Sequence, residues 1–552
     1  MKSQRIEPAA RERLLAQLVP AALAVGCYVG ALANGFAYDD IVIVRDNYTI
    51  HGWATIPFAL RIPYWYTSGH LYRPLTTLFF ALQWIASGGS PLAFHAVSIA
   101  LHAVACVLVA RIALRWWSPV AAAAAGCIFA IHPVHVEAVA NVVGQSELLC
   151  AISLLALMLV AARSSPGSAV RSRNSLTVIG VLAAAATASK EVGVVAPAIA
   201  WAAAWLAGRG AQREPGARDT SDVVGGEASR RRIWIMVAAS AAGVVFVLAV
   251  RVLILDALAG DHPHAAFLAA TPLQAYALAL ASIPRALSLI LVPQLPRPDY
   301  SPTEAELLHP DGILVALGCA VVIGAAALLV AHARRPTPLT LAAFFSIVTF
   351  APVSNLLLRT GVVVAERTLY SPSVGVALAY GAGIAAAWKA RRWVVLGLAC
   401  PLTALALVLT VNSVAVWRDS SAVFAAIRSR APASYKGYAL SAAASDDAGD
   451  HAGARLYYAR ALALFSLDPA VLENAGANAL VGGDTAEALA CFRRAVALDS
   501  SGLRARTSLA GLLIRRGDSA EARALLTDGL RRSPDQRTWR QMLGGLEPPL
   551  HH

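Results

Sequence analysis

Apolar runs close to the length of a bilayer-spanning helix recur between residues 14 and 416, and they constrain the fold more than any other feature. They lie near 14–32, 91–112, 118–131, 145–162, 175–189, 192–207, 233–255, 272–293, 311–332, 339–358, 371–388 and 393–416. A helix of about 20 apolar residues crosses the hydrocarbon core of a membrane. With 57% hydrophobic and 14% charged residues, the chain is more apolar than a soluble core requires. The sequence predicts an all-α, polytopic membrane helix bundle.

The run at 272–293 is an exception among these segments. It carries Pro284 and Arg285 at its middle. Proline removes a backbone donor, and a charge at bilayer depth is costly, so we expect a re-entrant or interfacial hairpin here. About eleven spans then remain, and most lysines and arginines between runs fall on one side. The positive-inside bias makes that side cytoplasmic, together with the N-terminus, and places the C-terminal segment on the extracytoplasmic side.

Other readings of charge, cysteine content and the first run are less consistent with the sequence. The net charge of +13 comes from basic residues that punctuate the apolar runs, so no nucleic-acid partner is expected. Six of the seven cysteines lie inside apolar runs without metal-type spacing, which predicts neither a metal site nor a disulfide framework. A cleavable leader is the alternative for the first run, but that run is longer than the apolar core of a usual signal peptide.

The residues after about 420 form a different kind of segment. Gly449-Asp450, Gly483-Asp484 and Gly517-Asp518 recur with a spacing of 34, which is the tetratricopeptide period. Small residues (Ala454, Ala488, Ala522) and larger apolar residues (Tyr458, Phe492, Leu526) occupy equivalent positions in these repeats. We predict a membrane domain over 1–418 and a soluble α-solenoid of about three repeats over 419–552. Such solenoids bind peptides on a concave face, although a structural or oligomerising role is an alternative.

Two adjacent carboxylates, Asp39 and Asp40, directly follow the first apolar run. They lie on the same predicted side as the repeats, in a loop that extends to Arg73 and contains aromatic residues, including Trp53 and Tyr66, of a kind that can contact sugars. An interfacial aromatic belt is the alternative for these rings, and a solvated loop or a helix cap is the alternative for the carboxylates.

Three further turns on this side carry charge. They contain His132, His135, Glu137 and Glu147; Lys190 and Glu191; and Glu366, Arg367 and Tyr370. Pro133 separates the two histidines, and their spacing is not that of a helical zinc pair, so we do not expect a metal. Lys190 and Glu191 could simply pair with each other, or the lysine could meet a phosphate. Together these turns predict a polar cavity that fits a lipid-linked phosphate.

The same residues resemble a known family. In order along the chain, the motifs are Ala37-Tyr38-Asp39-Asp40, Tyr72-Arg73-Pro74-Leu75, Phe94-His95, His132-Pro133-Val134-His135-Val136-Glu137, Gly144-Gln145-Ser146-Glu147, Lys190-Glu191 and Glu366-Arg367-Thr368-Leu369-Tyr370. The ordered set, with the repeats after it, resembles the transmembrane and tetratricopeptide-repeat O-mannosyltransferases of the C-type glycosyltransferase superfamily. Ser98 and Gln145 depart from residues common in that family, and Gln145 removes one possible phosphate contact.

The resemblance implies an inverting transfer of a sugar, by analogy mannose, from a polyprenyl-phosphate carrier to a Ser/Thr hydroxyl of a polypeptide at the extracytoplasmic face. It implies no metal and no cofactor beyond the lipid-linked substrate. Asp39 is the expected general base, supported by Asp40, and the expected phosphate ligands are Arg367, then Lys190 and Arg73. In an in-line displacement, base and phosphate ligands should lie on opposite sides of the sugar. The residues expected to orient the sugar or these cations are Glu366, His132, His135, Glu137, Glu147, Glu191 and Tyr370.

Two alternatives from other classes remain. A non-catalytic membrane scaffold could use the repeats to recruit envelope proteins, with the polar turns serving only packing. A transporter is less consistent with the sequence, because the polar groups collect at one face instead of near the middle of the bilayer. The high alanine, arginine and glycine content is typical of a GC-rich bacterial source, which would make the extracytoplasmic side the periplasm and the carrier an undecaprenyl phosphate.

Overall fold

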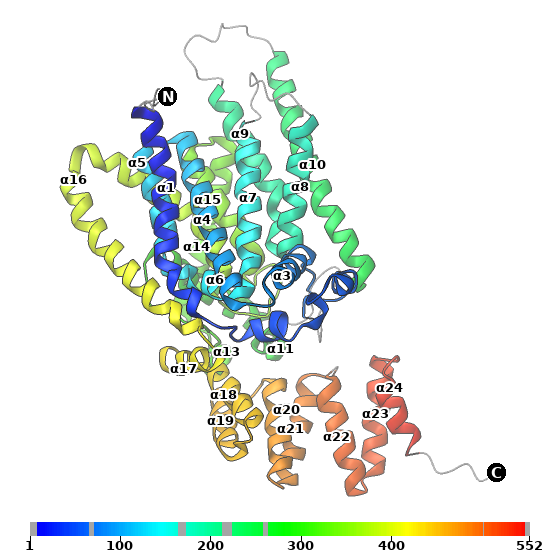
Figure 1. Ribbon diagram of the computed structural model, residues 1–552. Coiled ribbons are helices and arrows are strands. Elements are labelled where there is room, and N and C mark those ends of the chain that lie inside the picture. The colour runs from blue at the N-terminus through cyan, green and yellow to red at the C-terminus, as the bar shows by residue number, and fades with distance from the viewer. Residues whose placement is uncertain are drawn as a thin grey trace.

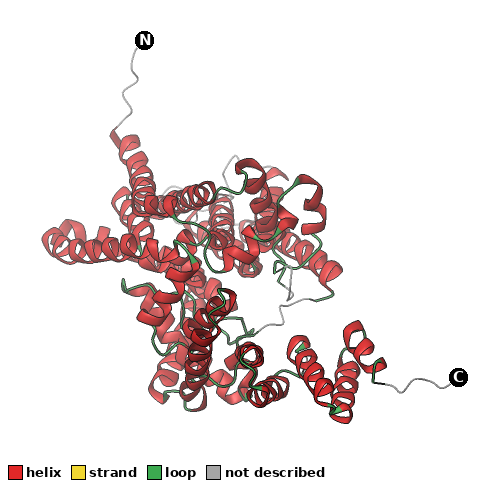
Figure 2. Cartoon of the chain, turned by 60° about the horizontal axis from the view of Figure 1, so that its bottom comes forward, coloured by secondary structure: helices red, strands yellow, loops and turns green. Residues whose placement is uncertain are grey.

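The computed structural model describes residues 8–65, 71–163, 173–211, 223–257, 263–500 and 502–546, and all regular secondary structure in these ranges is helical. No strand occurs within these ranges, and Figure 2 shows only helices and connecting loops. The predicted all-α fold is therefore confirmed. Tyr66 and the basic loops at 164–172 and 212–222 lie outside the described residues.

Nine helical segments in the described part are long and apolar enough to cross a membrane. The helices that contain them are α1 (Pro8–Tyr28), α4 (Pro91–Trp116), α7 (Gln145–Arg163), α9 (Ala196–Ala211), α10 (Val223–Leu255), α12 (Pro272–Leu291), α14 (Gly312–Arg334) and α16 (Tyr370–Val414), which supplies two segments. The two parts of α16 meet at a kink where Arg391 leaves the helical conformation, with φ −140° and ψ 39°. A polytopic membrane bundle is thus confirmed.

The remaining predicted runs are also helical, but they are shorter or bent. α5 (Pro119–Ile131) bends by 53° into a segment that contains α6 (Val136–Ala140), and counting this pair as one span gives up to ten spans. α8 (Arg173–Ser189) and α15 (Pro338–Phe350) are shorter apolar helices, as is α3 (Pro74–Ser87). The predicted number of about eleven exceeds the nine because polar turns cut these helices short. α5 stops at His132-Pro133, and α8 stops before Lys190.

The predicted hairpin at 272–293 is wrong, because α12 is one continuous helix with Pro284 inside it. Leu278 belongs to the same buried cluster as Tyr435 of the repeat segment, and Leu289, near the end of α12, belongs to the same cluster as Tyr300. α12 therefore shares buried clusters both with the repeat segment and with residues next to the fourth polar turn, although it is long enough to span.

Figure 1 shows how the two parts of the molecule are arranged. The N-terminal end of α1 lies at the top of the bundle, and the C-terminal helices form a row below its opposite end. These helices are α17 (Ser420–Arg430), α18 (Tyr435–Asp447), α19 (His451–Leu464), α20 (Pro469–Val481), α21 (Thr485–Leu498), α22 (Leu503–Arg516), α23 (Ser519–Arg532) and α24 (Arg537–Gly544). Short helices α2 (Ile56–Ala59), α11 (Ala265–Ala269) and α13 (Glu304–Leu308) lie at the same lower end of the bundle.

The repeat positions found in the sequence have equivalent structural roles. Gly449, Gly483 and Gly517 adopt φ of +82°, +78° and +86°, the left-handed region in which glycine avoids strain. The small residues Ala454, Ala488 and Ala522 have no exposed surface, so the paired helices approach closely there. The predicted tetratricopeptide solenoid is confirmed.

Contacts cross the predicted boundary at residue 418. The backbone N–H of Tyr38 donates to Ser420 Oγ at 2.9 Å, and the backbone N–H of Ser466 donates to Glu304 Oε2 at 2.9 Å. The loop after α1 is therefore attached to the start of α17. The division into domains at this residue stays a prediction.

Candidate active site

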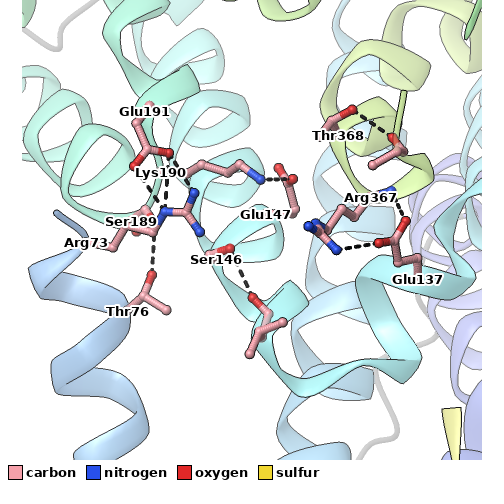
Figure 3. Close-up of polar contacts among 12 residues, drawn as sticks. Arg73, Thr76, Glu137, Ser146, Glu147, Ser189, Lys190, Glu191, Arg367 and Thr368 are labelled. Atoms are coloured by element: carbon pink, nitrogen blue, oxygen red, sulfur yellow. Dashed lines mark hydrogen bonds and ion pairs between the residues drawn. The ribbon is translucent and has the colours of Figure 1, made fainter. Parts of the chain in front are cut away.

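Four polar turns meet at the end of the bundle that faces the repeats. The first follows α1, the second connects α5 to α7, the third joins α8 to α9, and the fourth precedes α16. Figure 3 shows the charged side chains that come from these turns: Arg73, Glu137, Glu147, Lys190, Glu191 and Arg367. These six side chains and Asp39, which the sequence spreads over about 330 positions, form two ion-pair clusters.

Arg367 is the centre of the first cluster. Its Nη1 lies 2.6 Å from Glu137 Oε1, and its backbone N–H donates to Glu137 Oε2 at 2.9 Å. The same Nη1 lies 3.7 Å from Asp39 Oδ2, which is a loose contact. Nε and Nη2 have no hydrogen-bond partner among the described residues, and the side chain is 22% exposed. Arg367 therefore keeps donors that a further anion could use.

Asp39 is placed by the backbone next to it. Tyr38 adopts φ 52°, a left-handed conformation that is uncommon for a residue other than glycine. The N–H of Tyr38 donates to Ser420 Oγ at 2.9 Å, and its ring meets the Phe424 ring edge-on with centroids 6.0 Å apart. Both partners belong to α17. The position of Asp39 therefore depends on the start of the C-terminal segment.

The surroundings of Asp39 favour a proton-accepting role. Burial raises the pKa of its carboxyl above the ordinary value, while the charges of Arg367 and Lys436 act in the opposite direction. A carboxylate with a raised pKa is a stronger base, and the nearby cations favour its ionised form. Asp39 can therefore accept a proton from a hydroxyl that binds beside it.

Asp40 has different surroundings from its neighbour. Its Oδ1 accepts the N–H of Val143 at 2.8 Å, and its Oδ2 accepts the N–H groups of Val142 and Ala37, each at 3.3 Å. The side chain is fully buried, and burial raises the pKa of Asp40 to about 7 even though these amides favour the ionised form. Asp40 therefore joins the first polar turn to the second and fixes the backbone next to Asp39.

The second cluster consists of two complete ion pairs. Arg73 donates from Nη2 to Glu191 Oε2 at 2.8 Å and from Nε to the two carboxylate oxygens at 3.1 and 3.2 Å. Lys190 pairs with Glu147, and both side chains are buried, at 8% and 2% exposure. The charged form of Lys190 is disfavoured by burial, which lowers its pKa, while Glu147 opposes this shift. Lys190 and Glu191 thus pair with other residues, not with each other.

Glu366 and Tyr370 attach the fourth turn to the protein interior through hydrogen bonds. Glu366 Oε1 accepts the N–H of Arg297 at 2.7 Å and the hydroxyl of Tyr300 at 2.6 Å. The Tyr370 hydroxyl is 2.8 Å from His102 Nδ1, in the buried interior. These contacts hold the segment that carries Arg367.

The two histidines of the second turn are also engaged inside the protein. His135 Nδ1 lies 2.8 Å from Phe129 O, and its Nε2 lies 2.8 Å from Ser373 Oγ. His132 Nδ1 accepts the N–H of Val134 at 3.3 Å and caps the short helix that follows. Both rings therefore shape the turn that carries Glu137, and neither belongs to the two ion-pair clusters.

The expected separation of base and phosphate ligand is not met by Asp39 and Arg367 in this structure. A distance of 3.7 Å leaves no space for a sugar ring between them. Opposite charges in a poorly solvated pocket attract each other when no other anion is present. A sugar phosphate could fit between Asp39 and Arg367 only after these two side chains had separated.

Several residues of this region escaped the sequence analysis. Lys436, on α18, lies close enough to Asp39 to influence its pKa, and Ser420 holds Tyr38. Tyr300 and Arg297 hold Glu366. No local pattern could reveal them, because each partner lies more than 60 positions away along the chain.

The described residues contain no group of three or more His, Cys, Asp or Glu side chains that could hold a metal ion. The first cluster combines a buried carboxylate with an arginine that has free donors. Such a site can bind an oxyanion and deprotonate a nearby hydroxyl. The expectation that no metal or cofactor takes part stays a prediction.

Sequence comparisons identify relatives of this chain. A family model described as tetratricopeptide repeat matches residues 479–546. Human protein O-mannosyl-transferase TMTC3 is 34% identical over 176 residues, which is 30% of this chain and 19% of the human protein. Protein O-mannosyl-transferase Tmtc1 of Drosophila melanogaster is 36% identical over 184 residues, or 32% of this chain and 21% of the fly protein.

A longer match covers about two thirds of the chain. Mouse protein O-mannosyl-transferase TMTC4 is 27% identical over 427 residues, which is 68% of this chain and 57% of the mouse protein. The matched parts therefore span between 19% and 57% of the length of these three relatives. Together with the repeats and the membrane bundle, these matches make the chain a relative of the TMTC-type protein O-mannosyl-transferases.

Proposed function

We propose that this protein is a membrane glycosyltransferase that transfers a sugar, mannose by analogy with its relatives, from a polyprenyl-phosphate carrier to a Ser/Thr hydroxyl of a polypeptide. The observation that carries the proposal is the first cluster, where Asp39 approaches an arginine whose Nε and Nη2 have no partner among the described residues. The names of the relatives support the reaction class.

In the proposed reaction, the carrier phosphate binds to Nε and Nη2 of Arg367, and the Asp39 carboxylate moves away from Nη1 of the same arginine. Asp39 then removes the proton from the acceptor hydroxyl as the oxygen attacks the anomeric carbon. The bond between that carbon and the phosphate oxygen breaks, and the lipid phosphate leaves with its charge neutralised by arginine. Attack from the face opposite the phosphate inverts the configuration. The reaction needs no cofactor in this proposal.

The proposed orientation places this chemistry on the extracytoplasmic face of a cytoplasmic membrane, beside the repeats. It is supported by the row of repeat helices, which lies at the same end of the bundle as the polar turns. α18 brings Lys436 near Asp39, so an acceptor polypeptide held by the repeats would reach the first cluster directly.

The test is sugar transfer by the purified protein in lipid vesicles that contain a polyprenyl-phosphate-linked sugar, with a Ser/Thr-rich peptide as acceptor. Asp39→Asn removes the base without changing size, and we expect transfer to fall by about 100-fold or more. The matched control is Asp46→Asn, which changes an exposed aspartate of the same loop that pairs with Arg45. Transfer by Asp39→Asn at the wild-type rate would overturn the assignment of the base. If the wild type transfers no sugar from any such carrier, the non-catalytic scaffold is favoured instead.

A further inference from the structure

A cavity of about 470 Å³ lies between α12, α14 and the segment 294–300. Its polar lining includes Arg285, Ser288, Gln294 and Arg297, and its apolar lining includes Leu289 and Leu314. None of these residues belongs to the two ion-pair clusters. The cavity is therefore separate from the candidate active site.

The two arginines of this cavity are both exposed, and neither guanidinium makes a hydrogen bond or ion pair within the described ranges. The other polar groups are partly used, since Ser288 Oγ donates to Arg285 O at 2.8 Å and accepts Gln294 Nε2 at 3.2 Å. Two uncompensated guanidinium groups at one opening attract an anion, and their planar donors match the oxygens of a phosphate.

The walls of the cavity indicate that the anion belongs to a lipid. α14 is the most apolar candidate span, with a mean hydropathy of 2.9, and only 6% of its apolar window is buried inside the protein. Its surface therefore faces the acyl chains of the bilayer. The cavity meets α14 at Leu314, in the first turn of that helix, so its opening lies near one end of the span. The opening thus lies at the depth of lipid head groups, with an apolar surface beside it for a tail.

We propose that this cavity binds one lipid with a phosphate head group, which contacts Arg285 and Arg297 while the tail lies along α14. The site is also connected to the fourth polar turn. The backbone N–H of Arg297 and the hydroxyl of Tyr300, another lining residue, both donate to Glu366, the residue before Arg367. A lipid held here would therefore contact the segment that carries Arg367. Its binding does not require that the protein transfer a sugar.

Two lipid sources share this chemistry, the polyprenyl-phosphate carrier and an anionic phospholipid. The experiment is native mass spectrometry of the full-length protein in detergent, titrated with a polyprenyl monophosphate, with phosphatidylglycerol or with diacylglycerol, which lacks a phosphate. We expect each of Arg285→Gln and Arg297→Gln to weaken binding of a phosphate-headed lipid by about 10-fold, and the double variant to weaken it by about 100-fold. Inorganic phosphate should compete with the lipid at high concentration.

The matched control is Arg61→Gln, because Arg61 is an exposed arginine of the first loop that does not line the cavity. A loss restricted to the polyprenyl monophosphate would identify the carrier as the occupant, and an equal loss for phosphatidylglycerol would identify anionic lipids in general. Equal lipid binding by the wild type and the double variant would overturn the proposal. So would a loss in Arg61→Gln of the same size.

Discussion

Two ion-pair clusters lie at the same end of the bundle, and they differ in how many donors remain free. Arg367 holds Glu137, approaches Asp39 only to 3.7 Å and leaves Nε and Nη2 without a partner among the described residues. Arg73 uses Nε and Nη2 on Glu191, and Lys190 is buried with Glu147. A cation can hold a ligand only with donors that are not already engaged. Among the described residues, Arg367 keeps two guanidinium nitrogens without a partner, whereas Arg73 keeps only Nη1. This difference supports the proposal that the phosphate binds to the first cluster.

The largest expected effect concerns the stability of the second cluster. Lys190→Met keeps the size of the side chain but leaves Glu147, which is 2% exposed, without its cation. Removing one partner of a buried pair costs about 3–5 kcal/mol, so we expect a clear drop in Tm of the detergent-solubilised protein. Lys190→Met/Glu147→Gln should recover much of that loss, because no unpaired charge remains.

One result for Lys190→Met would contradict the proposed difference between the two clusters. Suppose that Lys190→Met keeps the wild-type Tm but binds a polyprenyl monophosphate more weakly. The lysine would then be a phosphate ligand, as the sequence alone predicts, and the two clusters would share the same role.

The next effect concerns catalysis at the first cluster. Arg367→Gln removes the cation that stabilises the departing phosphate, so kcat/KM should fall by about 100-fold to 1,000-fold. We expect Tm to change less than in Lys190→Met, because Glu137 keeps the backbone N–H of residue 367 as a donor. Arg359→Gln is the matched control, since Arg359 lies in the same loop but its guanidinium stacks over Tyr276 at 4.4 Å. A similar loss of kcat/KM in both variants would contradict a specific role of Arg367.

The smallest expected effect is a shift in pH dependence. Lys436 lowers the pKa of Asp39, so removing its charge in Lys436→Gln should raise that pKa. The base must be ionised, and transfer therefore falls as the pH drops through this pKa. The acidic limb of the kcat/KM profile should move to higher pH in Lys436→Gln and stay in place in Lys436→Arg. Identical acidic limbs in the wild type and Lys436→Gln would show that Asp39 does not titrate there.

Features that depend on local sequence could be predicted. Each apolar run is a helix, because hydrophobic length and composition determine where a membrane helix forms. The repeats followed from their period, since each repeat presents the same apolar positions to its neighbours, as Tyr458, Phe492 and Leu526 do. The charged turns also came together, because successive spans return every second loop to the same end of the bundle.

Features that depend on contacts between distant segments could not be predicted. The sequence suggested that Lys190 could pair with Glu191, yet their side chains turn to Glu147 and Arg73 on other elements. The three amides that hold Asp40 come from two loops about 100 positions apart. The hairpin at 272–293 was wrong because proline can be accommodated inside a helix when neighbouring elements pack against it. Gly318 of α14 lies so close to the Leu280 carbonyl, the acceptor that Pro284 cannot use, that an added Cβ would overlap it.

The central claim is that the contact between Arg367 and Asp39 opens to admit a phosphate while the second cluster stays closed. The most direct test is an experimental structure of the protein with a bound polyprenyl monophosphate. We expect the phosphate on Nε and Nη2 of Arg367, a separation of Nη1 and Asp39 Oδ2 well above 3.7 Å, and an Arg73–Glu191 contact that remains near 2.8 Å. A phosphate bound by Lys190 and Arg73, with Asp39 still beside Arg367, would contradict the claim.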